Sequence, residues 1–206
     1  CADVINMSLG GPGDAQSPIS QAVEAAVQAG VTVVVAAGNS YDYLTIGSPG
    51  AAPSVITVAN TDRNDQVHYS SSRGPLEHAD YLKPEIAAPG TNIEAAQSGG
   101  GLKRLTGTSM AAPHVAGAAA LLLQAQPQLT PLQVKHRLMH AADVISGNPA
   151  ESGSGRLNVL NALKQQFYLG ETALLLGRVP NEASLFSGSR QVTFFNPTAQ
   201  PVTVTA

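Results

Sequence analysis

The pattern of apolar positions at the start of the chain predicts a strand, a helix and a second strand. Residues 3–9 form a short apolar run that ends at paired glycines, and residues 31–37 are apolar at nearly every position, as in parallel strands buried on both faces. Between them, Ser17 and Pro18 form a typical helix start. Apolar residues then recur on one helical face as far as Gly30: Ile19, Val23, Ala26 and Val27. This order predicts a βαβ unit with a right-handed crossover.

The chain continues up to residue 166 with further strands and helices. Residues 54–59 predict another strand, and residues 60–103 predict mostly loop with short strands. The segment 108–124 is apolar nearly all round, which predicts a central, buried helix. Residues 130–133 form a capping box that opens a surface helix, and residues 158–166 predict a last helix. The surface helix carries its inward residues at Val134, Leu138 and Ala141. We therefore expect an α/β fold with a mainly parallel sheet flanked by helices.

The character of the sequence changes after about residue 167. Residues 191–195 and 202–205 alternate in the manner of β-strands, and Asn196-Pro197 between them predicts a turn. Two or three strands are too few for an independent domain. We therefore expect residues 1–166 to form the α/β unit and residues 167–206 to form a short β-rich tail. The tail is interpreted as the start of a β-sandwich module, with an appendage packed on the main domain as the alternative.

Two glycine-containing loops should meet at one edge of the predicted sheet. Gly10-Gly11 follow the first strand, and Gly38-Asn39 follow the second. Because ligands of open parallel sheets bind outside the carboxyl ends of the strands, we expect a cleft there.

Composition and charge exclude several classes of function. The net charge of -3, the lack of a basic cluster and an aromatic content of 4% argue against nucleic-acid binding. The longest apolar stretch, residues 115–123, is far shorter than the ~20 residues that span a bilayer, so no membrane segment is expected. Cys1 is the only cysteine, so no internal disulfide can form. The sequence starts without an initiator methionine or a signal peptide, and we expect it to be part of a longer precursor.

Ser109 is the first candidate for chemistry. It lies at the predicted start of the apolar helix, where Thr108 is available as the cap and Gly107 permits close approach. A helix N-terminus presents backbone N–H groups and the positive end of the helix dipole, which can stabilise an oxyanion beside a nucleophile. Ser109 is therefore a candidate nucleophile.

The sequence around Ser109 resembles a known catalytic motif. Residues 105–117 (Leu-Thr-Gly-Thr-Ser-Met-Ala-Ala-Pro-His-Val-Ala-Gly) are similar to the nucleophile motif of the subtilisin-like serine peptidases, the subtilase family or peptidase S8. Other segments resemble the family in the same order: residues 8–11 its substrate-binding strand, residues 36–39 its oxyanion-hole segment, residues 47–58 the wall of its specificity pocket, and residues 83–90 the stretch leading to the serine. The resemblance covers about residues 1–163.

The resemblance implies a role for each matching position. Ser109 would attack the scissile carbonyl and form an acyl-enzyme, while the Asn39 side-chain amide and the Ser109 backbone N–H would bind the oxyanion. Substrate-binding residues would pair with an extended peptide or form the specificity pocket: Ser8, Leu9, Gly10, Gly11, Ala36, Ala37, Gly38, Gly47, Ser48 and Pro49. The small side chains at residues 36–38 leave room for a sizeable substrate side chain.

The family's other two catalytic residues have no counterpart here. Its triad runs Asp, His, Ser, but Asp3 and Asp14 lack the Asp-Thr/Ser-Gly setting and no His-Gly-Thr-His sequence occurs. We therefore expect the subtilisin-like domain to be incomplete, the triad Asp and His to lie in a missing N-terminal part, and this chain alone to be inactive. Asp62 or Asp65 with His68 have the right order but fall in a polar loop.

The remaining histidines fit the role of base less well. His114 lies about 140° around the helix from Ser109, too far round to reach its hydroxyl. His136 and His140 are interpreted as surface residues of an outer helix.

The sequence argues against two other functions and leaves a third open. An α/β-hydrolase needs an acid and then a His after the serine, but no His follows Asp143. A nucleotide-binding module needs a Gly-x-Gly-x-x-Gly loop, which is absent. The alternative that stays open is a non-catalytic peptide-binding relative, although the presence of both Ser109 and Asn39 favours the enzyme.

The resemblance also implies a setting for the protein. Subtilases act on polypeptides, and a secreted or periplasmic location is expected. Many of them bind structural calcium. Asp42, Asp62 and Asp65 lie in suitable loops, but no EF-hand-like ligand spacing occurs and no metal ligand is assigned.

Overall fold

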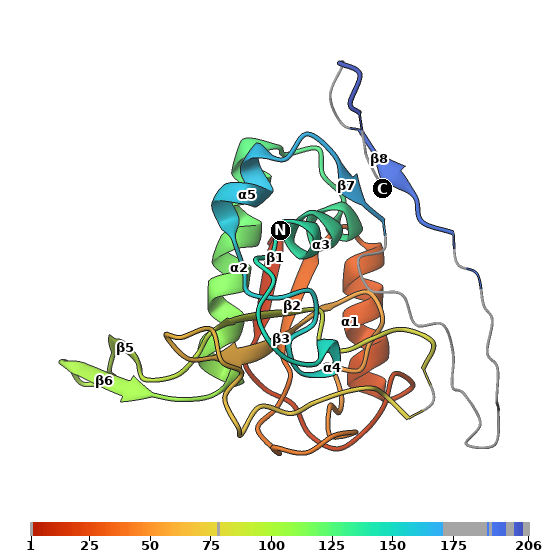
Figure 1. The fold of residues 1–206 in the computed structure, drawn as a ribbon. Coiled ribbons are helices and arrows are strands. Elements are labelled where there is room, and N and C mark those ends of the chain that lie inside the picture. The colour runs from red at the N-terminus through yellow and green to blue at the C-terminus, as the bar shows by residue number, and fades with distance from the viewer. Residues whose placement is uncertain (1, 78, 171–188, 190, 197–199, 204–206) are drawn as a thin grey trace.

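The computed structural model describes residues 2–77, 79–170, 189, 191–196 and 200–203. Its centre is a four-stranded parallel sheet in the order β1 (Val4–Met7), β2 (Thr32–Ala36), β3 (Ile56–Thr61) and β4 (Ile86–Pro89). Helix α1 (Pro18–Gln28) connects β1 to β2, and Figure 1 shows it on the opposite side of the sheet from the long helix α2 (Thr108–Ala125). The predicted α/β fold with a parallel sheet flanked by helices is confirmed.

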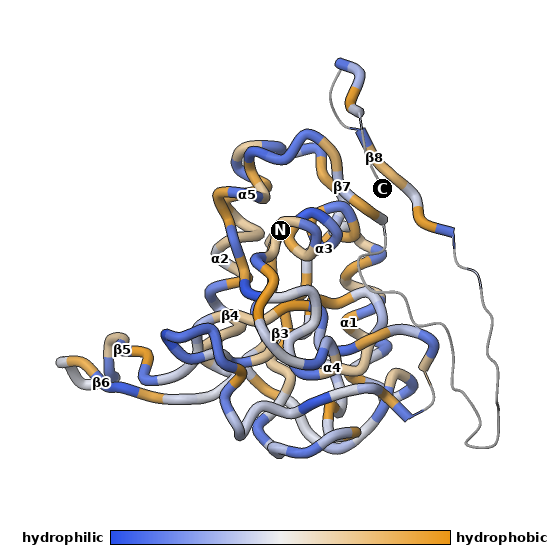
Figure 2. The backbone as a smooth tube through the Cα atoms, viewed as in Figure 1, coloured by the Kyte–Doolittle hydropathy of each residue, from blue (hydrophilic) through white to orange (hydrophobic). Residues whose placement is uncertain are grey.

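Strand β2 shows why the two-faced apolar pattern arises. All five of its residues are buried. Val33 and Val35 pack in one apolar cluster with Val23 and Val27 of α1, whereas Val34 and Ala36 belong to the cluster that contains the buried side of α2. Successive side chains of a strand point to opposite faces, so a strand covered by a helix on each face must be apolar throughout. Figure 2, coloured by hydropathy, shows hydrophobic segments running through the centre of the molecule between α1 and α2.

Helix α1 begins where the sequence predicts, but its contacts differ from the expectation. Ile19, expected to face inward, is 41% exposed, while Ser20 is fully buried. The Ser20 hydroxyl donates to the Asp14 carbonyl at 2.7 Å and lies 2.7 Å from the Ser48 hydroxyl, so its polar group is satisfied in the interior. The Ser17 hydroxyl accepts from Asp14 N–H and makes no capping bond to the helix.

Helix α2 is buried on one side only within the described part of the chain. Its sheet-facing positions are small or apolar, with Ala111, Ala112, Val115 and Leu122 inaccessible to solvent. On the other side, Leu121 is 51% exposed and His114 is also exposed. The expectation of a wholly buried helix was therefore wrong for these residues, because the sheet and helices α3 and α5 cover only part of the circumference.

Helix α3 (Pro131–His140) opens with the predicted capping box. Thr130 Oγ1 accepts from Gln133 N–H, and Gln133 Oε1 accepts from Thr130 N–H at 2.8 Å. The expected inward residues Val134, Leu138 and Ala141 are buried. However, Lys135 and Arg137 are buried too, and His136 and His140 are only partly exposed, so α3 is not a simple surface helix.

The remaining elements are short. Helix α4 (Pro149–Ser152) was not expected from the sequence, and α5 (Val159–Lys164) is the predicted last helix. Strands β5 (Ile93–Ala96) and β6 (Leu102–Leu105) form an antiparallel hairpin that projects from the body (Figure 1). Among the described residues, no helix is long and apolar enough to cross a membrane.

The expected β-rich tail falls largely outside the described residues. Strand β7 (Tyr168–Leu169) pairs antiparallel with β8 (Phe194–Phe195), which agrees with the strand predicted over 191–195. Residues 202–203 are not in a strand, and residues 204–205 of the second predicted strand are not described. The division into residues 1–166 and 167–206 therefore stays a prediction.

Candidate active site

The loops at the carboxyl ends of β1 and β2 meet the start of α2 around a cavity of about 590 Å³. The structure brings most of the predicted site residues to its lining: Ser8, Leu9, Gly10, Gly11, Ala36, Ala37, Gly38, Asn39, Gly47, Ser48 and Ser109. Pro49 does not line the cavity, and Thr108 does. The cleft thus forms at the sheet edge where the strand order places both glycine-containing loops.

Ser109 lies in the first turn of α2 and is partly exposed. Its hydroxyl is 3.3 Å from the Ser8 carbonyl oxygen, a weak contact that leaves the side chain free to take another partner. The Ser8 hydroxyl donates to the Ser109 carbonyl at 2.8 Å and accepts from the Asn6 amide at 3.1 Å. The backbone of Ser109 is therefore tied to the end of β1, while its nucleophilic oxygen is not.

The Asn39 side chain has a fixed orientation. Its Oδ1 accepts from Thr108 N–H at 3.0 Å and from the Thr108 hydroxyl at 3.3 Å. Because a backbone N–H can only be matched by an acceptor, the oxygen must face Thr108 and the Nδ2 group must point elsewhere. The described residues offer Nδ2 no hydrogen-bond partner, so the amide is a donor available at the edge of the cavity.

Thr108 has a role that the sequence did not indicate. We expected it to cap α2, but the N-cap is Gly107, which makes no side-chain cap. Instead, the buried Thr108 hydroxyl accepts from Gly38 N–H at 3.1 Å and donates to Asn39. A side chain at Gly107 would crowd the Asn39 amide, within 3.3 Å of Oδ1, which explains the glycine before Thr108. Residues 38–39 and 107–108 thus form one hydrogen-bonded unit.

The opposite wall of the cavity joins the loop after β1 to residues 47–48. Gly11 N–H donates to the Ser48 carbonyl at 2.9 Å in an isolated antiparallel bridge. A Cβ atom at Gly47 would collide with the Gly11 carbonyl, so only glycine fits there. Leu9 is 51% exposed and its neighbours 10 and 11 are exposed as well, so this stretch is open to an extended ligand.

The candidate bases within the chain have other partners. His68 Nδ1 lies 2.8 Å from the Ser70 hydroxyl, and His114 Nδ1 lies 2.9 Å from the Met110 carbonyl. His136 lies on α3, where burial, reinforced by the charge of Lys135, lowers its pKa to about 4. Of the described residues, none with an imidazole or carboxylate side chain hydrogen-bonds to the Ser109 hydroxyl.

The aspartates suggested for calcium do not fit a shared metal site. Asp42 Oδ1 accepts from Tyr43 N–H, and Asp62 Oδ1 accepts from the N–H groups of Asn64 and Gln66. Asp65 forms an ion pair with Arg156 at 2.7 Å. Within the described ranges, no group of three or more His, Cys, Asp or Glu side chains gathers in a way that could hold a metal ion. These carboxylates stabilise their own turns or pair with arginine.

Comparisons with known proteins agree with the geometry. Serine protease AprX of Bacillus subtilis is 40% identical over 192 residues, covering 80% of this chain and 43% of that protein. Subtilisin E of the same species is 41% identical over 161 residues, covering 76% of this chain and 40% of that protein. The chain thus spans less than half the length of these two relatives.

Solved structures give the same result. A protease from Pseudoalteromonas arctica matches with a TM-score of 0.70 at 34% identity, covering 79% of this chain and 50% of that chain. The prenylagaramide maturation protease PagA matches with a TM-score of 0.70 at 31% identity, covering 79% and 62%. The family model for the subtilase family matches residues 1–168. The chain therefore belongs to the subtilase family of serine peptidases, peptidase S8.

Proposed function

We propose that this chain carries the nucleophile and the oxyanion hole of a serine endopeptidase. The observation that carries the proposal is the orientation of Asn39, whose oxygen is held by Thr108 and whose Nδ2 group has no hydrogen-bond partner in the described part of the chain. Ser109, on the residue after Thr108, supplies the second donor through its backbone N–H. Two fixed donors beside a nucleophile stabilise the negative charge of a tetrahedral intermediate without reorganising during the reaction.

The reaction forms and then hydrolyses an acyl-enzyme. The Ser109 oxygen bonds to the scissile carbonyl carbon as a base removes its proton, and the carbonyl oxygen becomes the oxyanion. Collapse of this intermediate breaks the C–N bond, and the amine leaves with the proton from the base. Water then repeats the addition, releases the carboxylic acid and restores the Ser109 hydroxyl. Asn39 donates to the oxyanion in both steps.

The base and its orienting acid would come from polypeptide outside these 206 residues. Support comes from the described part of the chain, where His68 and His114 are engaged with Ser70 and Met110. A missing N-terminal part of the same catalytic domain would supply a His and an Asp, and the chain alone would be inactive. Residues 1–166 would then complete a peptidase domain, with residues 167–206 belonging to a β-rich module.

The substrate would be an extended polypeptide. The exposed stretch Ser8–Gly11 would pair with it by strand addition, and the side chain before the scissile bond would enter between residues 36–38 and residues 47–49. A secreted or periplasmic location fits a family of extracellular peptidases such as the subtilisins.

Serine-directed labelling tests this proposal. The full-length protein should react with diisopropyl fluorophosphate at Ser109 and hydrolyse peptides, whereas Ser109→Ala should do neither. The 206-residue chain alone should hydrolyse peptides at no more than background rate. A full-length protein that binds peptides but neither labels nor cleaves would establish the non-catalytic relative instead.

A further inference from the structure

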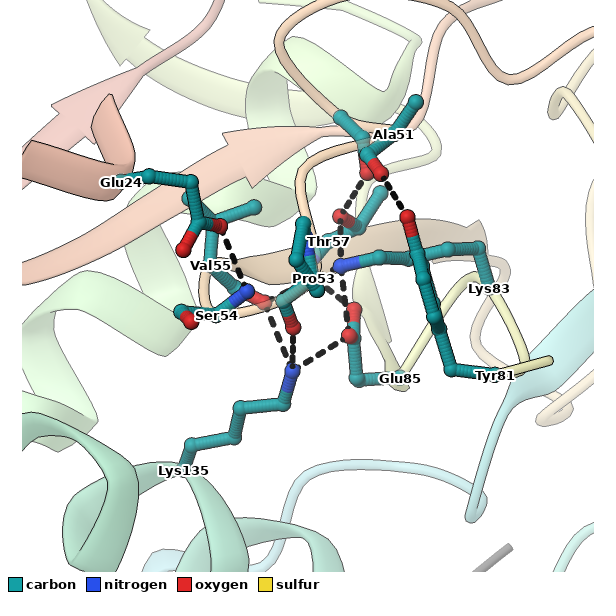
Figure 3. A network of polar contacts seen from close by, with 11 residues as sticks. Glu24, Ala51, Pro53, Ser54, Val55, Thr57, Tyr81, Lys83, Glu85 and Lys135 are labelled. Carbon is teal, nitrogen blue, oxygen red and sulfur yellow. Dashed lines mark hydrogen bonds and ion pairs between the residues drawn. The ribbon is translucent and has the colours of Figure 1, made fainter. Parts of the chain in front are cut away.

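A cluster of three charged side chains, Lys83, Glu85 and Lys135, is buried in the interior (Figure 3). It is linked by hydrogen bonds to the cavity wall, which comprises residues 47–49, of which Gly47 and Ser48 line the cavity. Lys83 and Glu85 flank Pro84 at the start of β4, and Lys135 reaches them from α3. Their exposed fractions are 0%, 3% and 7%. The Lys83 ammonium lies 2.5 Å and the Lys135 ammonium 2.6 Å from the same Glu85 oxygen.

The cluster has more positive than negative charge. Among the described residues, Glu85 is the only carboxylate in ion-pair contact with either lysine. Burying charge is costly unless every donor and acceptor is paired. The surplus N–H donors of the two lysines must therefore find neutral acceptors nearby.

Those acceptors lie on the segment that links the cavity wall to β3. Lys135 donates to the carbonyls of Pro53 at 2.6 Å and Val55 at 3.0 Å. Lys83 donates to the Val55 carbonyl and to the Thr57 hydroxyl oxygen, both at 3.1 Å. The second Glu85 oxygen accepts from Thr57 N–H at 2.8 Å. Side-chain bonds from the charged cluster thus hold residues 53–57 in place.

The Thr57 hydroxyl links the cluster to the wall. A carbonyl oxygen can only accept, so the Thr57 hydroxyl must donate to the Gly50 carbonyl, which lies 2.6 Å away. The Thr57 oxygen is then left to accept from Lys83. Gly50 follows the wall residues directly, and Ala51 N–H donates to the Gly47 carbonyl at 2.8 Å. A chain of hydrogen bonds therefore runs from Lys83 through Thr57 to the back of the wall.

The front of the same wall touches the predicted substrate strand. Ser48 accepts from Gly11 N–H through its carbonyl and contacts the buried Ser20 hydroxyl through its own. A shift of the wall would therefore change both the depth of the cavity and the spacing between its two sides. In a packed interior, small displacements of this kind are transmitted with little loss.

We propose that Thr57 is a positioning residue, held in place by Lys83, Glu85 and Lys135. It sets the location of the wall at residues 47–49 and thereby the preference for the substrate side chain before the scissile bond. The inference rests on the proposed peptidase function. The buried charged cluster thus has a role in substrate specificity although none of its three side chains lines the cavity.

The test compares Thr57→Val with Thr57→Ser in the full-length protein. Valine keeps the shape but removes the hydroxyl, whereas serine keeps the hydroxyl and removes only a methyl group. The readout is the ratio of kcat/KM for two peptides that differ only in Phe or Ala before the scissile bond. We expect Thr57→Val to change this ratio by at least about fivefold, and Thr57→Ser by less than about twofold, because pocket contacts control discrimination between side chains.

A second readout separates the wall from the nucleophile. Diisopropyl fluorophosphate has no side chain that enters the pocket, so its labelling rate at Ser109 should change less than about twofold in either variant. Lys83→Met provides an independent variant if Thr57→Val does not fold. It removes the donor that holds the Thr57 oxygen but leaves Glu85 paired with Lys135, and it should shift the Phe/Ala ratio in the same direction.

An unchanged Phe/Ala ratio in Thr57→Val and Lys83→Met, with labelling intact, would overturn the positioning role alone. A fall in kcat/KM by the same factor for both peptides would also overturn it, since a structural role lowers the amount of active enzyme without changing preference. Failure of the wild-type protein to label would instead overturn the proposed function on which the inference rests.

Discussion

The charge balance around Glu85 predicts that two neighbouring substitutions differ strongly in their effect on stability. Glu85→Gln keeps the shape of the side chain and an oxygen that can accept from Thr57 N–H, but it leaves the Lys83 and Lys135 ammonium groups without a counter-ion. Both nitrogens lie within 2.6 Å of one Glu85 oxygen. They are therefore at most about 5 Å apart, and their mutual repulsion of about 3 kcal/mol at an effective dielectric constant of about 20 is offset in the wild type by attraction to Glu85, which the variant lacks.

The folded protein could relieve this repulsion by releasing a proton from Lys83. Burial lowers the pKa of Lys83 to about 7 although Glu85 opposes the shift. The Glu85→Gln variant lacks that opposing charge, so the pKa of Lys83 should fall further. Removing one partner of a buried ion pair costs about 3–5 kcal/mol, so Glu85→Gln should lose about 3–5 kcal/mol at pH 5, which is about 6–20 °C in Tm for a domain of this size. As pH rises Lys83 releases its proton more easily, so the loss should be smaller at pH 8.

Lys83→Met is the matched control, because it leaves Glu85 and Lys135 as a balanced pair and replaces a buried charge with an apolar chain. Because no uncompensated charge is left behind, the cost of breaking a buried pair does not arise, and its Tm should lie no more than about 3 °C below the parent value. Thermal melts by circular dichroism at pH 5 and pH 8 make the comparison, with Ser109→Ala in every variant to prevent self-cleavage. If Glu85→Gln melts no lower than Lys83→Met at pH 5, the reasoning from charge balance is wrong.

Three further predictions concern single side chains. In the full-length enzyme, Asn39→Ala should lower kcat by about 10²–10³ with little change in KM, a magnitude known from subtilisin itself and not worked out for this chain; an effect on KM alone would contradict its role. His136 has a folded pKa of about 4 because of burial, below the ~6.5 of an unfolded histidine, so the unfolding free energy should fall as pH drops from about 6.5 to 4, and the fall should be smaller in His136→Gln. Urea melts at pH 7 and pH 4.5 measure this loss of unfolding free energy. An equal loss in the parent and in His136→Gln would refute the prediction. In the 206-residue chain, Leu122→Ala should cost about 2–5 kcal/mol because Leu122 is fully buried, whereas Leu121→Ala, at 51% exposure, should change stability by less than about 0.5 kcal/mol in the same urea melts.

Features encoded by neighbouring residues could be predicted from the sequence. The capping box at Thr130 and Gln133 is complete within four residues. The burial of every β2 side chain, on alternate faces of the sheet, follows from the apolar run in its sequence. The position of the cleft beside Gly10, Gly11, Gly38 and Asn39 could be predicted because parallel strands bring their carboxyl ends to one edge. In each case the deciding contacts lie within one element or follow from the order of elements.

The features that sequence reasoning missed depend on partners far away in the chain. Lys135 and Arg137 look like surface residues of an amphipathic helix, yet Arg137 is 1% exposed and donates to Gln126 and to the carbonyls of Ala162 and Gln165. Lys135 is buried because Glu85 lies 50 residues away in sequence but 2.6 Å away in space. Helical periodicity contains no information on such pairings. Long side chains also bury their stems wherever a distant acceptor satisfies the head group.

The two networks behind the cleft fix their groups by the same physical means. The Thr108 N–H can only donate, so it forces the oxygen of Asn39 toward itself and the amide toward the cavity. The Gly50 carbonyl can only accept, so it fixes the direction of the Thr57 hydroxyl, whose oxygen then accepts from Lys83. In both cases a group that can only donate or only accept fixes the orientation of a side chain that can do both. Ser109 lacks such a constraint, since among the described residues its hydroxyl hydrogen-bonds only to the Ser8 carbonyl, at 3.3 Å. A nucleophile must turn from its resting partner to the base that takes its proton, whereas oxyanion donors and pocket walls must already be in place. The distribution of fixed and free groups in this cleft therefore matches the roles assigned to Asn39, the wall and Ser109 in the proposed reaction.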